Sequence, residues 1–140
     1  MRNSVPTGNP WGDIVGYSRA VRVGQFIFVS GTTATGPEGQ ALHPGEPGPQ
    51  TRLILERIET ALGKLGASLK DVVETRIYVC DIAHWEAVGR VHGEIFADIR
   101  PATTLVEVSS LISPDLLIEI SATAVVDATP AAAATASVTA

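Results

Sequence analysis

The chain has 140 residues, of which 45% are hydrophobic and 18% are charged, and its formal net charge is −5. This length suits one domain with one core, and the composition is typical of a globular protein rather than a disordered one. A net negative charge gives no attractive field for a nucleic-acid backbone, so we expect no nucleic-acid partner and disfavour a nuclease.

Cysteine and histidine usage points to no disulfide and no metal. Cys80 has no second cysteine to pair with, which is typical of a reducing compartment. His43, His84 and His92 are not spaced as a metal-binding set. There is also no glycine-rich phosphate loop, and we expect no cofactor.

The N-terminal residues contain no apolar signal core, and no run approaches the roughly 18 apolar residues that cross a membrane. We therefore expect a soluble, cytoplasmic protein with no membrane partner.

The first predicted elements are a hairpin and a helix. Residues 16–23 and 26–30 are rich in β-branched and aromatic residues and flank a Gly-Gln pair, which predicts two strands around a tight turn. Residues 35–49 alternate repeatedly between proline, glycine and other residues, so they predict a loop. Apolar residues at helical spacing follow from Gln50 to Leu65, where Gly66 ends the pattern.

The second half predicts a strand, a helix and two more strands. Residues 72–79 form the strand, and Asp81 is placed to cap a helix that contains Val88, Val91 and Phe96. Pro101 should end this helix. The runs 100–108 and 116–120 then read as strands, separated by the turn residues Ser-Pro-Asp.

This element order predicts an α+β fold in which two helices pack on one face of a single mixed β-sheet. The second face of the sheet is apolar enough to pack against another subunit, which favours a closed oligomer. We place the domain at residues 1–126 and a low-complexity tail, rich in alanine and threonine, at residues 127–140.

Glu119 is the main candidate for acid/base chemistry. In an alternating strand, Leu116, Ile118 and Ile120 face one way, while Glu119 faces the other way among small polar neighbours. A carboxylate in this position is either a solvated sheet residue or an acid/base group at a cleft. The strand pattern alone leaves both readings open.

Four blocks in the chain, in this order, resemble the Rid (YjgF-like) family of reactive-intermediate deaminases. They are Gly16-Tyr17-Ser18 through Gly31, the block at 65–73, Tyr78 with Asp81, and Arg100-Pro101-Ala102 through Glu119. The resemblance covers roughly residues 14–126. It implies a chorismate-mutase-like fold and a homotrimer with clefts between subunits. It also implies hydrolysis of an enamine or imine with release of ammonia.

Carried over by position, the resemblance places ligand-contacting residues at Tyr17, Ser30, Gly31 and Glu119, with main-chain groups near Leu105. Glu119 becomes the expected catalytic residue.

Thr103 marks a departure from the family pattern, since active members have there an arginine that holds the substrate carboxylate. A threonine offers one hydroxyl in place of a planar guanidinium fork. Gly89 and His92 also differ from the asparagine and tyrosine found in many members. We therefore expect a substrate other than 2-aminoacrylate, with Arg100 or an arginine of a neighbouring subunit as possible replacements.

Each of these positions also has a plain structural reading. Tyr17 can be a strand aromatic, Ser30-Gly31 a strand end, Thr103 a strand residue and Arg100 a loop residue. Two functions remain in view: a hydrolase of imines or enamines, and a non-catalytic trimer that binds a metabolite or a protein. Ribonuclease activity is a weaker third.

Overall fold

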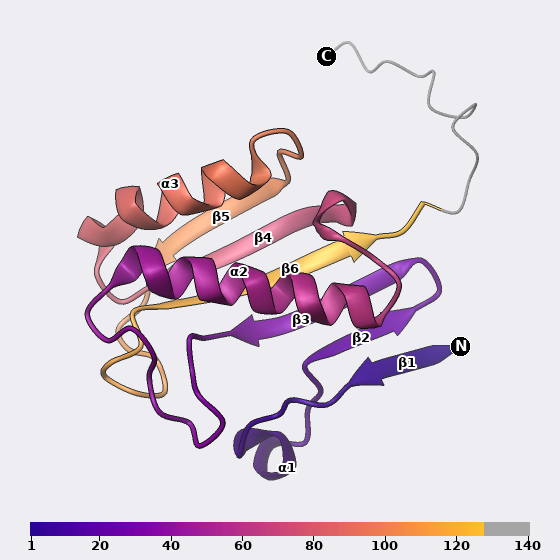
Figure 1. Cartoon of the computed structure of the whole chain (residues 1–140), viewed down its shortest axis with the longest axis horizontal. Coiled ribbons are helices and arrows are strands. Elements are labelled where there is room, and N and C mark those ends of the chain that lie inside the picture. Colours follow the sequence, from indigo (N-terminus) through magenta and orange to yellow (C-terminus); the bar gives the residue numbers. More distant parts are fainter. Residues whose placement is uncertain (128–140) are drawn as a thin grey trace.

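The computed structural model describes residues 1–127. Apart from Asp127, the predicted low-complexity tail lies outside the described residues. In the described part, the protein forms one six-stranded sheet with the strand order β1-β2-β3-β6-β4-β5 (Figure 1). The strands are β1 Arg2–Val5, β2 Ala20–Val23, β3 Phe26–Thr32, β4 Val72–Val79, β5 Ala102–Glu107 and β6 Ile118–Val125. The β4–β5 pair is parallel and the other neighbours are antiparallel, so the predicted mixed sheet is confirmed.

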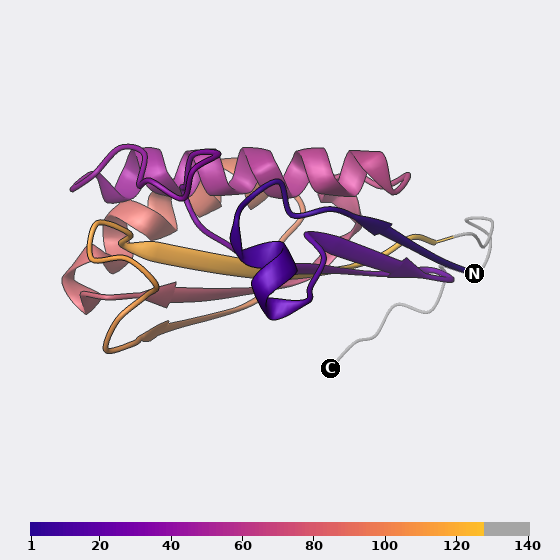
Figure 2. The same cartoon turned by 90° about the horizontal axis from the view of Figure 1, so that it is seen from below.

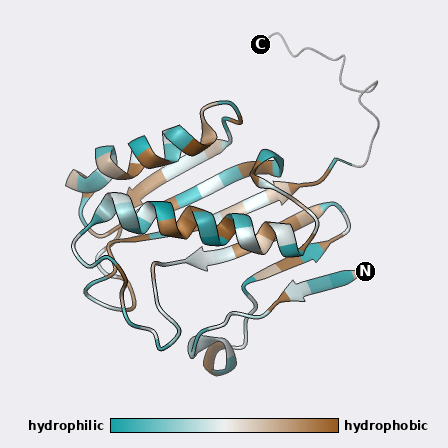
Figure 3. Ribbon diagram, in the orientation of Figure 1, coloured by the Kyte–Doolittle hydropathy of each residue, from teal (hydrophilic) through white to brown (hydrophobic). Residues whose placement is uncertain are grey.

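Two long helices, α2 (Pro47–Lys64) and α3 (Trp85–Phe96), lie together on one face of the sheet (Figure 2). Hydrophobic and hydrophilic residues alternate along α2 with the helical period (Figure 3), and its apolar side is buried against the sheet. Shorter elements complete the fold: α1 Trp11–Val15 and two 3-10 turns, η1 Leu69–Asp71 and η2 Ile82–His84. The prediction of two helices on one face is therefore confirmed.

The β6 strand keeps the alternation that its sequence predicts. Leu116, Ile118 and Ile120 are at most 1% exposed, whereas Glu119 and Ser121 are partly exposed on the opposite face. The register pairs Glu119 with Tyr78 of β4. Burial of one face thus fixes the direction in which the Glu119 side chain points.

The face of the sheet away from the helices carries large apolar side chains in the isolated chain. Phe26 and Phe28 of β3 are each 51% exposed, Val73 of β4 is 47% exposed and Val106 of β5 is 41% exposed. An apolar patch of this kind is typical of a protein–protein interface.

Several element boundaries differ from the predictions. The edge strand β1 was not predicted, because Arg-Asn-Ser-Val has no apolar alternation. Residues 16–19 lie outside β2. Helix α2 starts at Pro47, inside the predicted loop, since proline is tolerated in a first helical turn.

The second helix also differs at both ends. Asp81 caps η2 by accepting a hydrogen bond from the Ala83 amide at 2.9 Å, and α3 begins only after this turn. Helix α3 ends at Phe96, before Pro101, and Arg100 has a left-handed φ of 53°. The turn at Arg100 therefore reverses the chain before Pro101 is reached.

Candidate functional site

A cavity of about 280 Å³ opens beside Glu119. Four residues selected from the sequence line it together: Tyr17, Ser30, Gly31 and Glu119. The remaining lining residues are Asn9, Trp11, Val15, Arg19, Thr33 and Ile112. Residues far apart in the sequence thus meet at one place, which we call the Glu119 pocket.

A local irregularity in the sheet shapes the floor of this pocket. The β3–β6 register shifts between Val29 and Thr32, and Gly31 lies in the shifted segment. The Glu119 carboxylate is so close to the Gly31 backbone that a Cβ atom at position 31 would lie 2.8 Å from Glu119 Cδ. A side chain at position 31 would make the end of the Glu119 side chain shift, so glycine allows the carboxylate its present position.

The environment of Glu119 favours its neutral form. Burial raises the pKa of Glu119, and the positive charge of Arg19 partly opposes that rise. A raised pKa makes a carboxyl group a better proton acceptor in its charged form and keeps it protonated to a higher pH than an exposed glutamate. Glu119 thus lines a cavity and is partly buried, rather than lying on a fully solvated face of the sheet.

Tyr17 and Ser30 are held by hydrogen bonds at the rim. The Ser30 hydroxyl donates to the Ser18 carbonyl at 2.7 Å, so its oxygen stays oriented by the backbone. The Tyr17 hydroxyl accepts a hydrogen bond of 3.4 Å from the Asn9 amide. Its phenolic proton is left for another acceptor.

Arg19 is the functional candidate that sequence reasoning missed. Its Nη2 donates to the Gly31 carbonyl at 2.6 Å, and its guanidinium carbon lies 5.9 Å from the centre of the Tyr17 ring. Burial lowers the pKa of Arg19, while Tyr17 and Glu119 oppose the change. Tyr17 and Arg19 precede β2, so strand alternation could not have placed them on one side, and the sequence carries no local signal for Arg19.

The three candidates on and before β5 lie away from this pocket in the chain. Strands β6 and β4 separate β3 from β5. Thr103 Oγ1 bonds to Thr75 Oγ1 at 2.8 Å, and Thr75 Oγ1 bonds to His92 Nε2 at 2.9 Å. Because Thr75 is buried on the helix side, Thr103 also faces the helix layer.

Leu105 and Arg100 are likewise remote from Glu119. Leu105 packs against the hydrophobic core. Arg100 is exposed and lies beside His92, Phe96 and Pro101 at the end of α3. One copy of the chain therefore brings together Tyr17, Ser30, Gly31 and Glu119, but not Thr103, Leu105 or Arg100.

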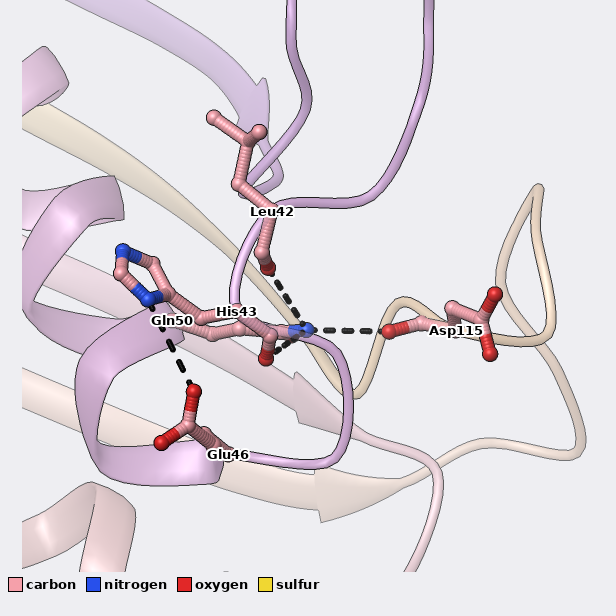
Figure 4. Close-up of polar contacts among 5 residues, drawn as sticks. All are labelled: Leu42, His43, Glu46, Gln50 and Asp115. Carbon is pink, nitrogen blue, oxygen red and sulfur yellow. Dashed lines mark hydrogen bonds and ion pairs between the residues drawn. The ribbon is translucent and has the colours of Figure 1, made fainter.

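Gln50 holds the segment that leads into β6 and was not singled out in the sequence. Its fully buried side chain donates to the carbonyls of Leu42, His43 and Asp115 at 3.2, 3.1 and 2.9 Å (Figure 4). Its carbonyl oxygen accepts from the Leu117 amide at 2.9 Å. Gln50 thus fixes the segment that enters β6 two residues before Glu119.

Within residues 1–127, no group of three or more His, Cys, Asp or Glu side chains is arranged to hold a metal ion. The Nδ1 atom of His43 lies 3.7 Å from Oε2 of Glu46, three residues further along the chain. In the same part of the chain, no helix has the length and apolar character needed to cross a membrane.

Comparison with known proteins gives consistent matches. The family model described as Endoribonuclease L-PSP matches residues 9–126. A RutC family protein of Pyrococcus abyssi is 40% identical over 108 residues, which cover 77% of this chain and 84% of that protein. The 3-aminoacrylate deaminase RutC of Acinetobacter baylyi is 36% identical, over 86% of this chain and 94% of that protein.

A solved structure agrees with the fold. A Mycobacterium tuberculosis protein described as a member of the YjgF/YER057c/UK114 family superposes with a TM-score of 0.82 at 50% identity. The match covers 90% of this chain and all of that one.

Proposed function

This chain belongs to the Rid (YjgF/RutC) family, and from that membership and the Glu119 pocket we propose that it hydrolyses imines or enamines. The products are a carbonyl compound and ammonia. The single observation that carries the proposal is the position of Glu119. Its partly buried carboxyl, with a raised pKa, lies in a pocket that also contains Tyr17, Ser30 and Arg19.

The proposed reaction needs one group that can move protons in both directions. Neutral Glu119 protonates the substrate, which converts an enamine into an iminium ion or charges an imine nitrogen. The resulting carboxylate then accepts a proton from water as the water attacks the carbon of the C–N bond. Glu119 then gives this proton to the amine nitrogen of the adduct, the C–N bond breaks and ammonia leaves, while the hydroxyl of the adduct becomes the carbonyl and its proton passes back to the Glu119 carboxylate. One water is consumed and the carboxyl returns to its starting state.

Arg19 gives the pocket a positive charge of its own. We propose that its guanidinium orients a carboxylate of the substrate beside Glu119, which assigns Arg19 the role that the family gives to an arginine at the Thr103 position. A charged donor held by the Gly31 carbonyl is already oriented before substrate arrives.

The complete cleft is proposed to form between subunits of a homotrimer. Support comes from the exposed Phe26 and Phe28 on the helix-free face and from the position of β5 at the far edge of the sheet. In such an assembly, Thr103, Leu105 and Arg100 of one subunit can approach the Glu119 pocket of the next.

The proposed substrates are short unsaturated amino acids other than 2-aminoacrylate. Thr103 lacks the fork that fits a carboxylate next to a 2-imino carbon, and the relative from Acinetobacter baylyi is named for 3-aminoacrylate. A 3-amino enamine holds its carboxylate one carbon farther from the reacting C–N bond. We therefore place 3-aminoacrylate-like acids ahead of 2-aminoacrylate.

The test is ammonia release from imines and enamines generated in the assay, with the uncatalysed rate subtracted. Native protein should accelerate release, and Glu119→Gln should not. Glu119→Gln keeps the size of the side chain and removes its acid/base chemistry. If native protein gives no acceleration on either a 2-imino or a 3-amino acid, the hydrolase proposal is wrong.

The alternative is a trimer that binds a metabolite or a protein without chemistry. It predicts saturable binding of the same acids in the pocket, weakened by substitution of Arg19, with no effect of protein on ammonia release. Ribonuclease activity is disfavoured by the net charge of −5.

A further inference from the structure

A second cavity, of about 310 Å³, lies on the other side of Arg19. Helix α2, the segment after β1 and the segment after β3 enclose it. Three cationic residues line it, Arg19, Arg57 and Lys64, of which Arg57 and Lys64 lie two turns apart on α2. We call it the Arg57 cavity.

The charges in this cavity are of one sign. The other lining residues are Val5, Pro6, Thr7, Gly8, Asn9, Thr32, Thr33, Thr35, Gly36, Pro37, Thr60 and Ala61, so no carboxylate is among them. In the described part of the chain, the ion pairs are formed by other residues. The three cations therefore face a shared space that no carboxylate lines, and the described carboxylate that acts on Arg19 is Glu119 in the neighbouring pocket.

Uncommitted hydrogen-bonding groups accompany these charges. Arg19 Nε is shielded from solvent and has no hydrogen-bond partner. Thr33 and Thr35 also line the cavity, and their hydroxyls form no hydrogen bond with the described residues but stay accessible to solvent. A buried donor without an acceptor is unfavourable, and it is usually explained by a water, an ion or a ligand.

Structural roles explain the cavity only in part. Arg57 donates to the Thr33 carbonyl at 3.3 Å and also to the Thr35 carbonyl, which holds the loop after β3. Lys64 lies in the last turn of α2, where a cation is favourable. These roles leave the buried Nε atom of Arg19 unexplained.

We propose that the Arg57 cavity binds a small oxyanion with two negative charges, a phosphate monoester or a dicarboxylate. Two negative charges offset most of the positive charge of Arg19, Arg57 and Lys64. The oxygens accept hydrogen bonds from the free donors, and phosphate and carboxylate groups both suit the guanidinium fork. The proposal concerns binding and is independent of any reaction at Glu119.

The test is calorimetric titration of the full chain at low ionic strength with two probes, inorganic phosphate and succinate. Saturable binding of at least one probe is expected. Lys64→Gln should weaken it about two- to fivefold, because this lysine is exposed. Arg57→Gln should weaken it by about tenfold or more.

Lys70→Gln is the matched control. It removes the same charge from an exposed lysine on η1 that does not line the cavity, and it should bind the probes as native protein does. Because Arg57→Gln can loosen the loop after β3, its melting temperature is measured as well, and Lys64→Gln then decides the result.

Each outcome has a clear reading. Selective binding of phosphate assigns a phosphate monoester, selective binding of succinate assigns a dicarboxylate, and binding of both assigns a general dianion site. The proposal is overturned if native protein binds neither probe up to about 10 mM. It is also overturned if Lys64→Gln and Lys70→Gln bind equally tightly.

Discussion

The backbone of Gly31 and the carboxylate of Glu119 occupy adjoining space that leaves no room for a side chain on residue 31. A Cβ atom there would overlap Glu119 Oε2. Gly31 has no left-handed φ angle. What matters at this position is therefore the absence of a side chain and not the backbone conformation. The end of the Glu119 side chain uses the space that a side chain on residue 31 would fill.

The first prediction follows from this contact. Gly31→Ala should push the Glu119 carboxylate out of position and lower ammonia release by about tenfold or more. Gly63→Ala is the control, because Gly63 lies in α2 with open space around it. That variant should keep native turnover and gain about 0.5–1 kcal/mol of unfolding free energy. Native activity in Gly31→Ala would show that the position of Glu119 does not matter.

The second prediction concerns stability and pH. Burial raises the pKa of Glu119 in the folded protein, so the folded state binds its proton more tightly than the unfolded state. The stability from this group is complete below the unfolded pKa of about 4.3 and is lost as pH rises through the higher folded pKa. The free energy of unfolding of native protein should therefore fall relative to that of Glu119→Gln over this range. Chemical denaturation at several pH values measures it, with Glu38→Gln, an exposed loop carboxyl, as reference. If the difference in unfolding free energy between native protein and Glu119→Gln stays constant across these pH values, Glu119 does not titrate with a raised pKa.

The third prediction isolates Arg19. Its charge opposes the rise in the pKa of Glu119, so Arg19→Gln should raise that pKa further. The pH–rate profile should shift to higher pH, and KM for carboxylate substrates should rise. Arg19→Lys should restore part of the profile, because it keeps the charge, and less of the binding, because it loses the fork. An unshifted profile in Arg19→Gln would contradict the proposed coupling.

The fourth prediction concerns the missing family arginine. A charge-assisted hydrogen bond contributes about 1.5–3 kcal/mol, so Thr103→Arg should improve turnover of 2-iminopropionate by roughly ten- to a hundredfold. Thr103→Gln is the control, since it lengthens the side chain without charge. Both variants lose the hydrogen bond to Thr75, which makes their folding costs comparable. Native rates that already equal those of Thr103→Arg would support Arg19 as the cation in use.

The fifth prediction concerns assembly. Light scattering should give a trimer mass at micromolar concentration, and removal of residues 129–140 should not change it. Phe28→Glu should reduce the mass, because it puts a charge on the apolar helix-free face. Trp85→Glu is the control, because Trp85 is similarly exposed but begins α3 in the helix layer. A monomer mass for native protein would rule out the inter-subunit cleft.

Strands with one buried face could be predicted well from the sequence. The alternation in β6 placed Glu119 on the face away from the helices, because its sequence neighbours Ile118 and Ile120 are buried under them. The edge strand β1 could not be predicted, since polar Arg-Asn-Ser pairs only through its backbone with β2. Hydrophobic alternation in the sequence was sufficient to predict a strand that buries one face. It could not predict a strand that is defined only by its backbone hydrogen bonds to a neighbouring strand.

The site was predicted in part for a related reason. Tyr17, Ser30, Gly31 and Glu119, which the sequence singled out, line one pocket, but nothing local to Arg19 reveals that its side chain reaches Gly31. That contact depends on the pairing of β2 with β3. The separation of Thr103 from Glu119 depends on the strand order, which a family pattern aligned by position does not contain.

Arg19 forms part of the wall of both cavities, so one guanidinium serves two neighbouring spaces. An anion beside Arg57 draws on the same positive charge that moderates the pKa of Glu119. Phosphate in an assay buffer would then bind near Arg19 and alter the measured rates. Its addition at constant pH and ionic strength should move the pH–rate profile in the same direction as Arg19→Gln, and a zwitterionic buffer becomes the proper baseline for every rate measured on this protein.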